Sequence, residues 1–150
     1  MAKSTNIRWM IRRDMSDVYA IDQHCTAPWK EVDFTDALSQ RETIGMVIES
    51  GDEILGYMVY QLGEKQIMLV RIGVRKDHRR AGLGRLMIEK IKSKLSPAKR
   101  DTLAAVVRER HLDLQLFLRG CGLTCCLVEK GHFCKPEEDG YRMEYCKGEE

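Results

Sequence analysis

Residues 75–91 form the stretch "RKDHRRAGLGRLMIEKI", which is the most informative part of the sequence for the fold. Basic side chains crowd around Gly82 and Gly84, and a helical pattern follows at once. The apolar residues of that pattern share one helical face, and they are Leu83, Leu86, Met87, Ile91 and Leu95. Such a stretch is a nucleic-acid patch, a solvated helix start or a cradle for a phosphorylated cofactor.

The junction before this helix has the properties of a phosphate cradle. A strand is expected to end near Val74, and the helix is expected to begin near Gly82. The first backbone N–H groups of a helix have no partner inside it and lie at the positive end of the helix dipole, so they attract anions. Gly82 and Gly84 let an anion approach the backbone closely. Charge-assisted hydrogen bonds are available from Arg79, Arg80 and Arg85.

The two common phosphate-binding patterns are absent from this stretch. It lacks the Gly-Lys-Ser/Thr ending of a Walker A loop, and Gly84 is not followed by the third glycine of a G-x-G-x-x-G loop. A nucleic-acid patch is disfavoured because the net charge is only +2 and no aromatic residues interleave the basic residues of 75–80. The stretch therefore favours a third kind of phosphate cradle, and no nucleic-acid partner is expected.

The rest of the chain alternates between strand and helix patterns. Strands are expected over residues 7–11, 44–50, 53–62, 64–74, 102–107, 123–130 and 141–146. Helices are expected over residues 15–25, 34–41, 83–95 and 112–120. The strands between residues 44 and 74 predict an antiparallel meander, and the strand–helix–strand order that follows predicts a parallel pair. The expected fold is one α/β domain over residues 1–150, with about four helices and a mixed, mostly antiparallel sheet of about seven strands.

Local signals predict where some of these elements begin and end. Asp14 and Thr35 stand where the N-caps of the first two helices are expected. Gly120 or Gly122 is expected to close the last helix in a left-handed conformation. The polar segment "GHFCKPEEDG", residues 131–140, is expected to be a loop between the last two strands.

The start of the chain and its cysteines bear on the compartment. The segment "MAKSTNIRWMIRR" lacks the apolar run of a secretory signal peptide, and no apolar run approaches the ~20 residues that span a bilayer. We therefore expect a cytoplasmic protein with no membrane partner, in which the six cysteines are reduced thiols. The cysteines and the histidine of residues 121–134 are spaced poorly for zinc, so no metal is expected.

The segment "RRAGLG", residues 79–84, resembles the Q/R-x-x-G-x-G/A signature of the GNAT superfamily of acetyl-CoA-dependent N-acetyltransferases. A meander, the strand "LVRIGV" directly upstream and an amphipathic helix directly downstream match the surroundings of that signature. Within the superfamily, the chain is most similar to the RimI-type ribosomal-protein alanine N-acetyltransferases. Further segments that carry this resemblance are "APWKEVDF" (27–34), "VRERHLDLQLFLRGCGL" (107–123) and "KPEEDGYRMEY" (135–145). The resemblance extends over the whole chain and implies the GNAT fold.

The resemblance also implies where acetyl-CoA, the co-substrate, binds. In the family, backbone amides of the fourth strand pair with the pantetheine arm, and the matching residues are Ile72, Gly73 and Val74. The signature loop binds the pyrophosphate, and this role maps to Arg79, Arg80, Ala81, Gly82, Leu83, Gly84 and Arg85. An amide N–H near Ile72 is expected to stabilise the oxyanion. Two further positions that face the cofactor in the family hold His111 and Leu118.

Three positions depart from the family's residues, and two of them are where proton transfer is expected. Leu118 replaces the tyrosine that is the usual general acid, and Val106 replaces the glutamate that is the expected base of RimI-type enzymes. His111 replaces an asparagine that contacts the cofactor. The remaining candidates for a base are Glu31 in the expected substrate loop, His111, and Tyr141 on the last strand.

Four functions are compatible with these patterns to different degrees. Transfer of acetyl to a protein or peptide N-terminus rests on the full-length resemblance, and Trp29 is then either a wall of the peptide site or a core residue. Acetylation of a small amine is the second, because one fold changes its acceptor through its loops. An acetyl-CoA-binding module without catalysis is the third, and Leu118 and Val106 favour it. Nucleic-acid binding is the fourth and is disfavoured by the charge. We expect the first.

Overall fold

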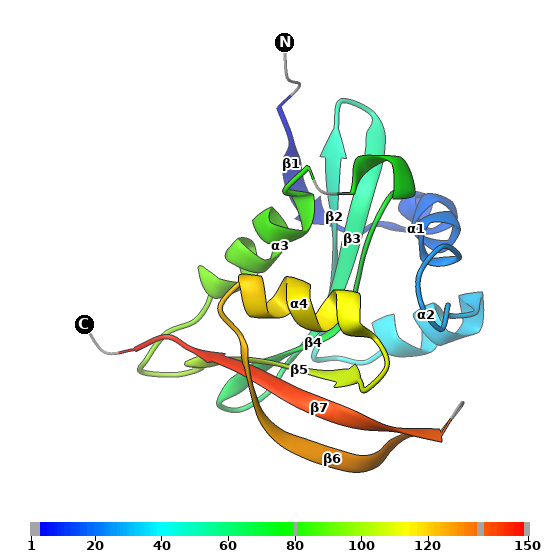
Figure 1. The fold of residues 1–150 in the computed structure, drawn as a ribbon. Coiled ribbons are helices and arrows are strands. Elements are labelled where there is room, and N and C mark those ends of the chain that lie inside the picture. The colour runs from blue at the N-terminus through cyan, green and yellow to red at the C-terminus, as the bar shows by residue number, and fades with distance from the viewer. Residues whose placement is uncertain (1–3, 80, 135–136, 149–150) are drawn as a thin grey trace.

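The computed structural model describes residues 4–79, 81–134 and 137–148. Its centre is a seven-stranded sheet in the order β1-β2-β3-β4-β5-β7-β6 (Figure 1). Neighbouring strands are antiparallel except β4 and β5, which are parallel. The strands are β1 (Asn6–Trp9), β2 (Thr43–Ser50), β3 (Glu53–Leu62), β4 (Gln66–Val74), β5 (Thr102–Arg108), β6 (Thr124–Cys134) and β7 (Glu137–Cys146). The predicted mixed sheet, with its meander and its parallel pair, is confirmed.

Helices cover both faces of the sheet. They are α1 (Met15–Asp22), α2 (Glu31–Leu38), α3 (Leu83–Lys92) and α4 (Leu112–Gly120), with 3-10 turns η1 (Arg12–Asp14) and η2 (Lys76–His78). Alternate side chains of a strand point to opposite faces, so the buried residues form two clusters. One cluster joins α3 and α4 to the sheet through Met58 and Met87, and the other joins α1 and α2 to it through Phe34 and Tyr57 (Figure 1). None of the helices in the described ranges is long and apolar enough to cross a membrane.

Asp14 occupies the predicted N-cap position of α1, but its side chain makes no capping hydrogen bond, because its carboxylate is bound by the Arg8 guanidinium at 2.8 and 3.0 Å. The predicted N-cap of the second helix, Thr35, is wrong. The helix α2 begins at Glu31, so Thr35 lies inside it and its hydroxyl donates to the Glu31 carbonyl at 3.1 Å. Gly122 follows α4 with a φ of 99°, so of the two glycines expected to close that helix it is the left-handed one.

Two further expectations, for α3 and for the last hairpin, also differ from the structure. Leu86 is 46% exposed and Ile88 is fully buried instead, so the buried stripe of α3 is rotated relative to the expected one. The predicted loop over residues 131–140 is wrong, because β6 and β7 both extend into it. Pairing between the two strands outweighs the turn-like composition, and a register shift accommodates Gly131, which has a φ of 63°.

The pairing between the parallel strands β4 and β5 ends halfway along β4. Their pairing joins Gln66–Leu69 to Thr102–Ala105 and goes no further in the described ranges. It ends at a β-bulge, where Val70 is an extra residue of β4 opposite β3. Beyond the bulge, residues 71–74 pair with no residue of β5, so this edge of β4 is free of strand pairing in the described ranges. The chain then leads from β4 through η2 to the start of α3.

Candidate active site

The N-terminal end of α3 is open to solvent. Gly82 precedes the helix with a φ of 83°, a left-handed conformation that favours glycine. A Cβ built on Gly82 would meet no atom within 4 Å, so the space beside this end is free. The bond from Leu86 N to Gly82 O, at 3.1 Å, begins the helical ladder. The N–H groups before Leu86 therefore point out of the helix end, where an anion can reach them.

Gly84 serves the packing of two helices. A Cβ built on Gly84 would lie 2.8 Å from Phe117 Cζ, on the facing side of α4. Any larger residue would push this aromatic ring away, so glycine lets α3 and α4 approach closely. The expectation that both glycines make room for an anion therefore needs correction. Gly82 faces free space, whereas Gly84 faces a ring.

Two arginines of the loop are bound to backbone carbonyls. Arg79 Nη2 donates to the His24 carbonyl at 3.2 Å, and Arg85 Nη2 donates to the Gly120 carbonyl at 2.7 Å. Arg80 lies outside the described residues. Because a carbonyl is neutral, a phosphate group is the stronger acceptor for a guanidinium. Both arginines can therefore exchange their present partners for an anion.

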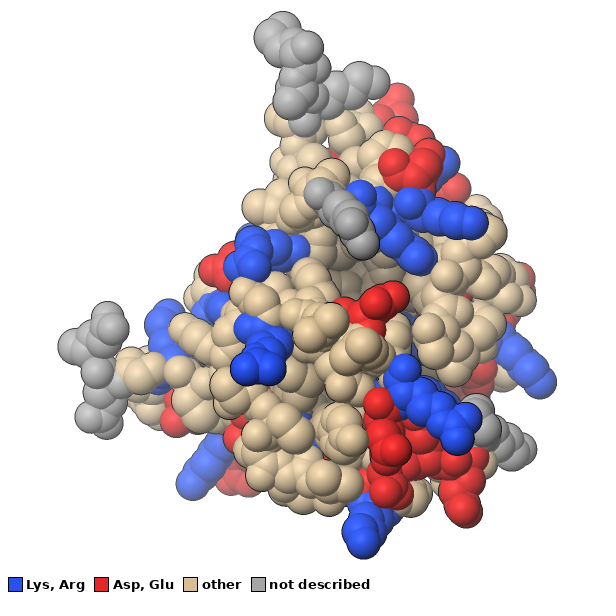
Figure 2. Space-filling model, in the orientation of Figure 1, with Lys and Arg blue, Asp and Glu red and all other residues tan. Residues whose placement is uncertain are grey.

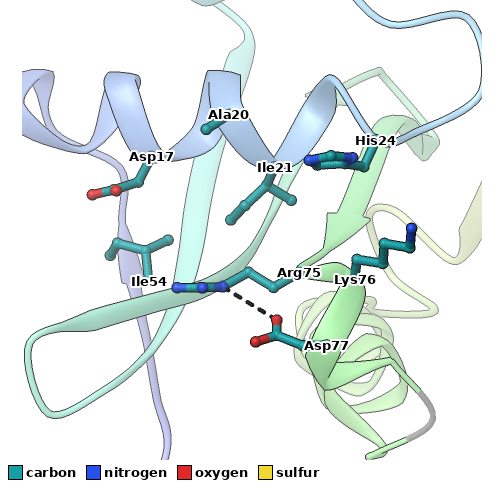
Figure 3. A pocket seen from close by; sticks show the side chains of 8 residues that line it. All are labelled: Asp17, Ala20, Ile21, His24, Ile54, Arg75, Lys76 and Asp77. Carbon is teal, nitrogen blue, oxygen red and sulfur yellow. Dashed lines mark ion pairs between the residues drawn. The ribbon is translucent and has the colours of Figure 1, made fainter.

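A cavity of about 600 Å³ adjoins this loop on its α1 side. It is lined by Asp17, Ala20, Ile21, His24, Ile54, Arg75, Lys76 and Asp77. In Figure 3, the α1 side chains lie along one wall and those of residues 75–77 lie along the opposite wall. Arg75 is held by Glu53 at 2.7 Å and by Asp77 at 3.5 Å. Figure 2 shows Lys and Arg side chains gathered beside a hollow on the face that carries α3 and α4.

On the α1 and α2 face of the sheet, a buried ion pair holds the loop between these helices. The Asp22 carboxylate is fully buried and accepts hydrogen bonds from Arg71 Nε at 2.6 Å and Nη2 at 3.1 Å. Arg71 follows Val70, the bulge residue of β4. It also donates to the Ala27 carbonyl at 3.0 Å, and its guanidinium lies 5.0 Å from the centre of the Trp29 ring. The sequence signal for this site is a charged residue, Arg71, inside the otherwise apolar run "IMLVRIGV" (67–74).

His111 stands at the start of α4 and contacts the same loop. Its Nε2 atom lies 3.4 Å from Thr26 Oγ1. Burial lowers the pKa of His111, and the positive charges of Arg71 and Arg108 lower it further, against the opposing effect of nearby carboxylates. The imidazole is therefore neutral near pH 7 and able to accept a proton.

Comparison with known protein families identifies the chain. The model of the acetyltransferase (GNAT) family matches residues 9–123, a range that contains the open helix end and the parted strands β4 and β5. The chain belongs to the GNAT family. It is therefore an acetyltransferase, and acetyl-CoA is its acetyl donor. No curated protein sequence matches this GNAT acetyltransferase significantly.

Solved structures of similar fold share little sequence with this GNAT acetyltransferase. The ribosomal-protein-S18-alanine N-acetyltransferase from Escherichia coli is 20% identical, with a TM-score of 0.82 over 98% of this chain and 96% of that chain. Ard1 from Thermoplasma volcanium is 17% identical, with a TM-score of 0.83 over 97% and 99%. A mutant of spermidine N-acetyltransferase SpeG from Vibrio cholerae is 12% identical, with a TM-score of 0.77 over 95% and 94%. At these identities the likeness shows the fold.

The two positions that lack the family's acid and base are occupied by residues that pack against neighbouring elements. Val106 on β5 packs against β7, because a Cβ built on Gly140 would lie 2.5 Å from Val106 Cγ1. Leu118 is fully buried in the cluster that joins α4 to the sheet. Its side chain therefore faces the core, whereas the sequence led us to expect it beside the cofactor. Both residues act in packing here.

Glu31 and Tyr141, the other two candidates for a base, lie in different parts of the structure from His111. Glu31 is the first residue of α2 and is exposed. Tyr141 lies opposite Val107 in the sheet and lines a second cavity, of about 420 Å³, with residues of α4 and β6. It therefore faces α4, on the side of the sheet away from the Asp22–Arg71 pair. His111 is thus the candidate that contacts the loop between α1 and α2.

Of the cysteine thiols, only that of Cys25 lies near Asp22 and Arg71. All the cysteines are free, with Cys121 buried and Cys25 half-buried at the end of α1. Burial raises the pKa of the Cys25 thiol, with a further rise from Asp22, so it is a weaker nucleophile than an ordinary thiol. No group of three or more His, Cys, Asp or Glu residues is placed to hold a metal ion within the part of the chain that the structure describes.

Proposed function

We propose that this GNAT acetyltransferase transfers acetyl to the α-amino group of a protein or peptide N-terminus. The observation that carries the proposal is the part of β4 that does not pair with β5, which precedes the free space at Gly82 in the chain and contacts, through Arg71, a fixed loop that carries Trp29. An aromatic ring held in a fixed loop is a wall against which an extended chain end can lie. One solved structure of the same fold acts on a ribosomal-protein alanine, as its name states. Such acceptors are expected in the cytoplasm, the compartment that the sequence predicts.

The free edge of β4 and the open end of α3 fit acetyl-CoA together. Acetyl-CoA supplies an acetyl thioester when it is bound. We assign its pantetheine arm to the backbone of Ile72, Gly73 and Val74, because an unpaired strand edge binds an extended group by main-chain hydrogen bonds. We assign its pyrophosphate to the loop from Arg79 to Arg85, where the N–H groups beside Gly82 are free.

His111 is the base that this geometry favours. Its Nε2 atom faces the loop at Thr26, and its lowered pKa keeps it neutral at the pH where an α-amino group, with a pKa of about 8, begins to lose its proton. As the amine nitrogen bonds to the acetyl carbon, Nε2 accepts the amine proton directly or through one water. An amide N–H of β4 near Ile72 donates to the carbonyl oxygen while negative charge develops on it.

No residue at the family's acid position can protonate the leaving sulfur. Leu118 is apolar and buried, so the C–S bond breaks with the sulfur departing as a thiolate. A thiol has a pKa of about 8.5, so its thiolate is an acceptable leaving group in water near neutral pH. Positioning of the two reactants then supplies most of the rate, and this contribution reaches several kcal/mol without a dedicated acid.

A second candidate function is acetyl-CoA binding without catalysis. It is favoured by one observation, the presence of Val106 and Leu118, whose side chains cannot transfer a proton, where relatives carry their base and acid. This function requires the same acetyl-CoA site and leaves His111 without a chemical role. The two functions therefore agree on binding and disagree on turnover.

Mass spectrometry of acetylated products tests the proposal. A panel of peptides that differ in their first residue is incubated with the protein and acetyl-CoA between pH 6 and 9. Each peptide contains an internal lysine, and a copy with a blocked N-terminus is the matched control. We expect acetyl on the free N-terminus and none on the blocked copy.

The same assay separates the alternatives. Acetyl on spermidine alone would support a small-amine enzyme and contradict the proposal. Acetyl-CoA binding by calorimetry with no product at any pH would support the binding module. Absence of acetyl-CoA binding would contradict both the transfer and the binding function.

A further inference from the structure

The buried Asp22 carboxylate is surrounded by hydrogen-bond donors from three residues. It accepts hydrogen bonds from Arg71 Nε and Nη2, from the Trp29 backbone N–H at 2.6 Å and from the Tyr57 hydroxyl. Burial raises the pKa of Tyr57, so its hydroxyl keeps its proton and remains a donor. The Asp22 side chain is 0% exposed and that of Arg71 is 14% exposed. A buried charge that is fully paired in this way holds its partners in one geometry.

Arg71 reaches this carboxylate from β4, from the part of the strand that does not pair with β5. It follows the bulge at Val70 and precedes Ile72, so its backbone belongs to the part of β4 that leaves β5. The Arg71 guanidinium also donates to the carbonyls of Thr26, at 3.5 Å, and Ala27, at 3.0 Å. A single side chain of β4 therefore binds the loop at several points along its length.

The loop over residues 23–30 depends on these bonds for its shape. It contains no regular helix or strand. Ala27 has a φ of 50°, a left-handed conformation that an alanine adopts only under constraint from its surroundings. The Arg71–Trp29 contact and the Asp22 bond to the Trp29 N–H fix the aromatic residue of the loop. The constraint on the loop thus comes mainly from the ion pair.

We propose that Arg71 is a positioning residue that fastens the acceptor loop, residues 23–30, to the cofactor strand β4 and so aligns the acceptor amine with the acetyl thioester. This inference deepens the proposed function and rests on it. The link also includes His111, because Thr26 in the same loop lies 3.4 Å from its Nε2 atom. Lysine cannot replace Arg71 fully, because a lysine ammonium lacks the planar fork that binds both carboxylate oxygens.

The chain offers a matched control in a second pair of the same kind. Arg8 binds the buried Asp14 carboxylate with two hydrogen bonds, at 2.8 and 3.0 Å. Arg8 lies on β1, at the edge of the sheet, and is six residues from Asp14 in sequence. Loss of either arginine leaves a buried carboxylate without its partner, so both losses should reduce stability. Of these two arginines, only Arg71 contacts the acceptor loop.

Steady-state kinetics and calorimetry on the full chain test the role of Arg71. We expect Arg71→Gln to lower kcat/KM for the acceptor peptide about tenfold to a hundredfold, since small misplacements have effects of this size. We expect its Kd for acetyl-CoA to change less than about threefold, and Arg71→Lys to restore part of the loss. Arg8→Gln should lower Tm and leave kcat/KM within about twofold of the wild type, because this pair holds η1 to the edge strand β1 and makes no contact with the acceptor loop.

Two results would overturn the inference. One is a rise in the acetyl-CoA Kd of Arg71→Gln that matches its loss in kcat/KM, and the other is an equal loss in Arg8→Gln. Where Arg71→Gln does not fold, Arg71→Lys and the charge-balanced pair Arg71→Gln with Asp22→Asn provide the same comparison.

Hydrogen exchange separates a failure of this inference from a failure of the proposed function. If the wild type acetylates no acceptor, the proposed function is wrong, yet the loop can still be examined. Arg71→Lys should then speed amide exchange over residues 23–30 and leave residues 83–92 of α3 unchanged, whereas Arg8→Gln should do neither. Unchanged exchange in the loop would contradict the fastening role by itself.

Discussion

The acetyl-CoA side and the acceptor side of this protein are built in different ways. Apart from His111 and Leu118, the expected acetyl-CoA contacts lie within residues 72–85, one continuous stretch of chain, and most of them are backbone groups. The acceptor side is assembled from Asp22, Arg71 and His111, which lie on or beside α1, β4 and α4. The contacts that hold it together are between side chains, and Asp22 and Arg71 are 49 residues apart. The acetyl-CoA side therefore depends on the local conformation of one segment, whereas the acceptor side depends on contacts that form only when the chain folds.

This difference predicts how each side responds to change. Backbone donors survive most substitutions, so the acetyl-CoA side should be sensitive mainly where a side chain blocks the backbone. Side-chain contacts are lost with the residue that makes them, so the acceptor side should be sensitive at single residues. The three variants below test these expectations, from the largest effect to the smallest.

Gly82→Leu should have the largest effect. Glycine leaves free space beside the open end of α3, and a leucine side chain would fill the place of the anion. We expect acetyl-CoA to bind about a thousandfold more weakly or worse, a loss of about 4 kcal/mol measured by calorimetry. The strain at a φ of 83° should lower the free energy of unfolding by only about 1 kcal/mol, the cost of a left-handed residue.

Gly84→Leu is the matched control for that variant. The new side chain would collide with Phe117, whose Cζ atom lies 2.8 Å from the Cβ position. Overpacking of this kind should lower the free energy of unfolding by about 3 kcal/mol in a urea titration. Equal stability of the two variants would contradict the different roles assigned to the two glycines.

His111→Asn should have the next largest effect, about a hundredfold in kcat, the usual contribution of a positioned base. Protonation of the acceptor α-amino group, with a pKa of about 8, lowers the rate of both proteins as pH falls. Because the pKa of His111 is lowered from its ordinary value, the ratio of the wild-type kcat to that of the variant should stay level down to about pH 6.5 and decline below it. Tyr141→Phe should leave the pH profile of kcat unchanged, and a change there would favour Tyr141 as the base.

The same shift has a consequence for folding. Because the pKa of His111 is lower in the folded than in the unfolded chain, the unfolded chain binds its proton first as pH falls. Protonation therefore favours unfolding, and the stability contributed by the neutral form is present above about pH 6.5 and lost below it. His111→Asn should remove this part of the pH dependence of Tm.

Arg79→Gln should have the smallest effect of the three. The guanidinium must leave the His24 carbonyl before it binds a phosphate oxygen, so the gained bond is partly offset by the lost one. We expect the Kd for acetyl-CoA to rise about tenfold at low salt and less at high salt. Arg41→Gln, at an exposed residue between α2 and β2, is the control for loss of one positive charge. Equal changes in the Kd for the two substitutions would contradict a specific contact between Arg79 and acetyl-CoA.

Local patterns predicted the regular part of the fold. The strands β3 and β5 and the helix α4 begin at the expected residues, because strict periodicity and nearby turn residues mark them. The errors lie where distant parts of the chain meet. Asp14 binds Arg8 instead of capping a helix, and the turn-like segment 131–140 is largely drawn into β6 and β7. Backbone pairing and ion pairing with another element outweigh local propensity in these places.

The residues of one stretch, with its glycines, arginines and periodic helix, predicted an open helix end that can bind a phosphate group, and the resemblance of that stretch to the GNAT signature predicted the family and the acetyl donor. Only the tertiary structure decided that Gly84 packs against Phe117, that Leu118 belongs to the core and that Arg71 binds Asp22 and the loop over residues 23–30. The physical reason is the range of the interactions. Helix periodicity and backbone conformation act over a few residues, whereas packing and buried ion pairs join residues that meet only when the sheet has formed.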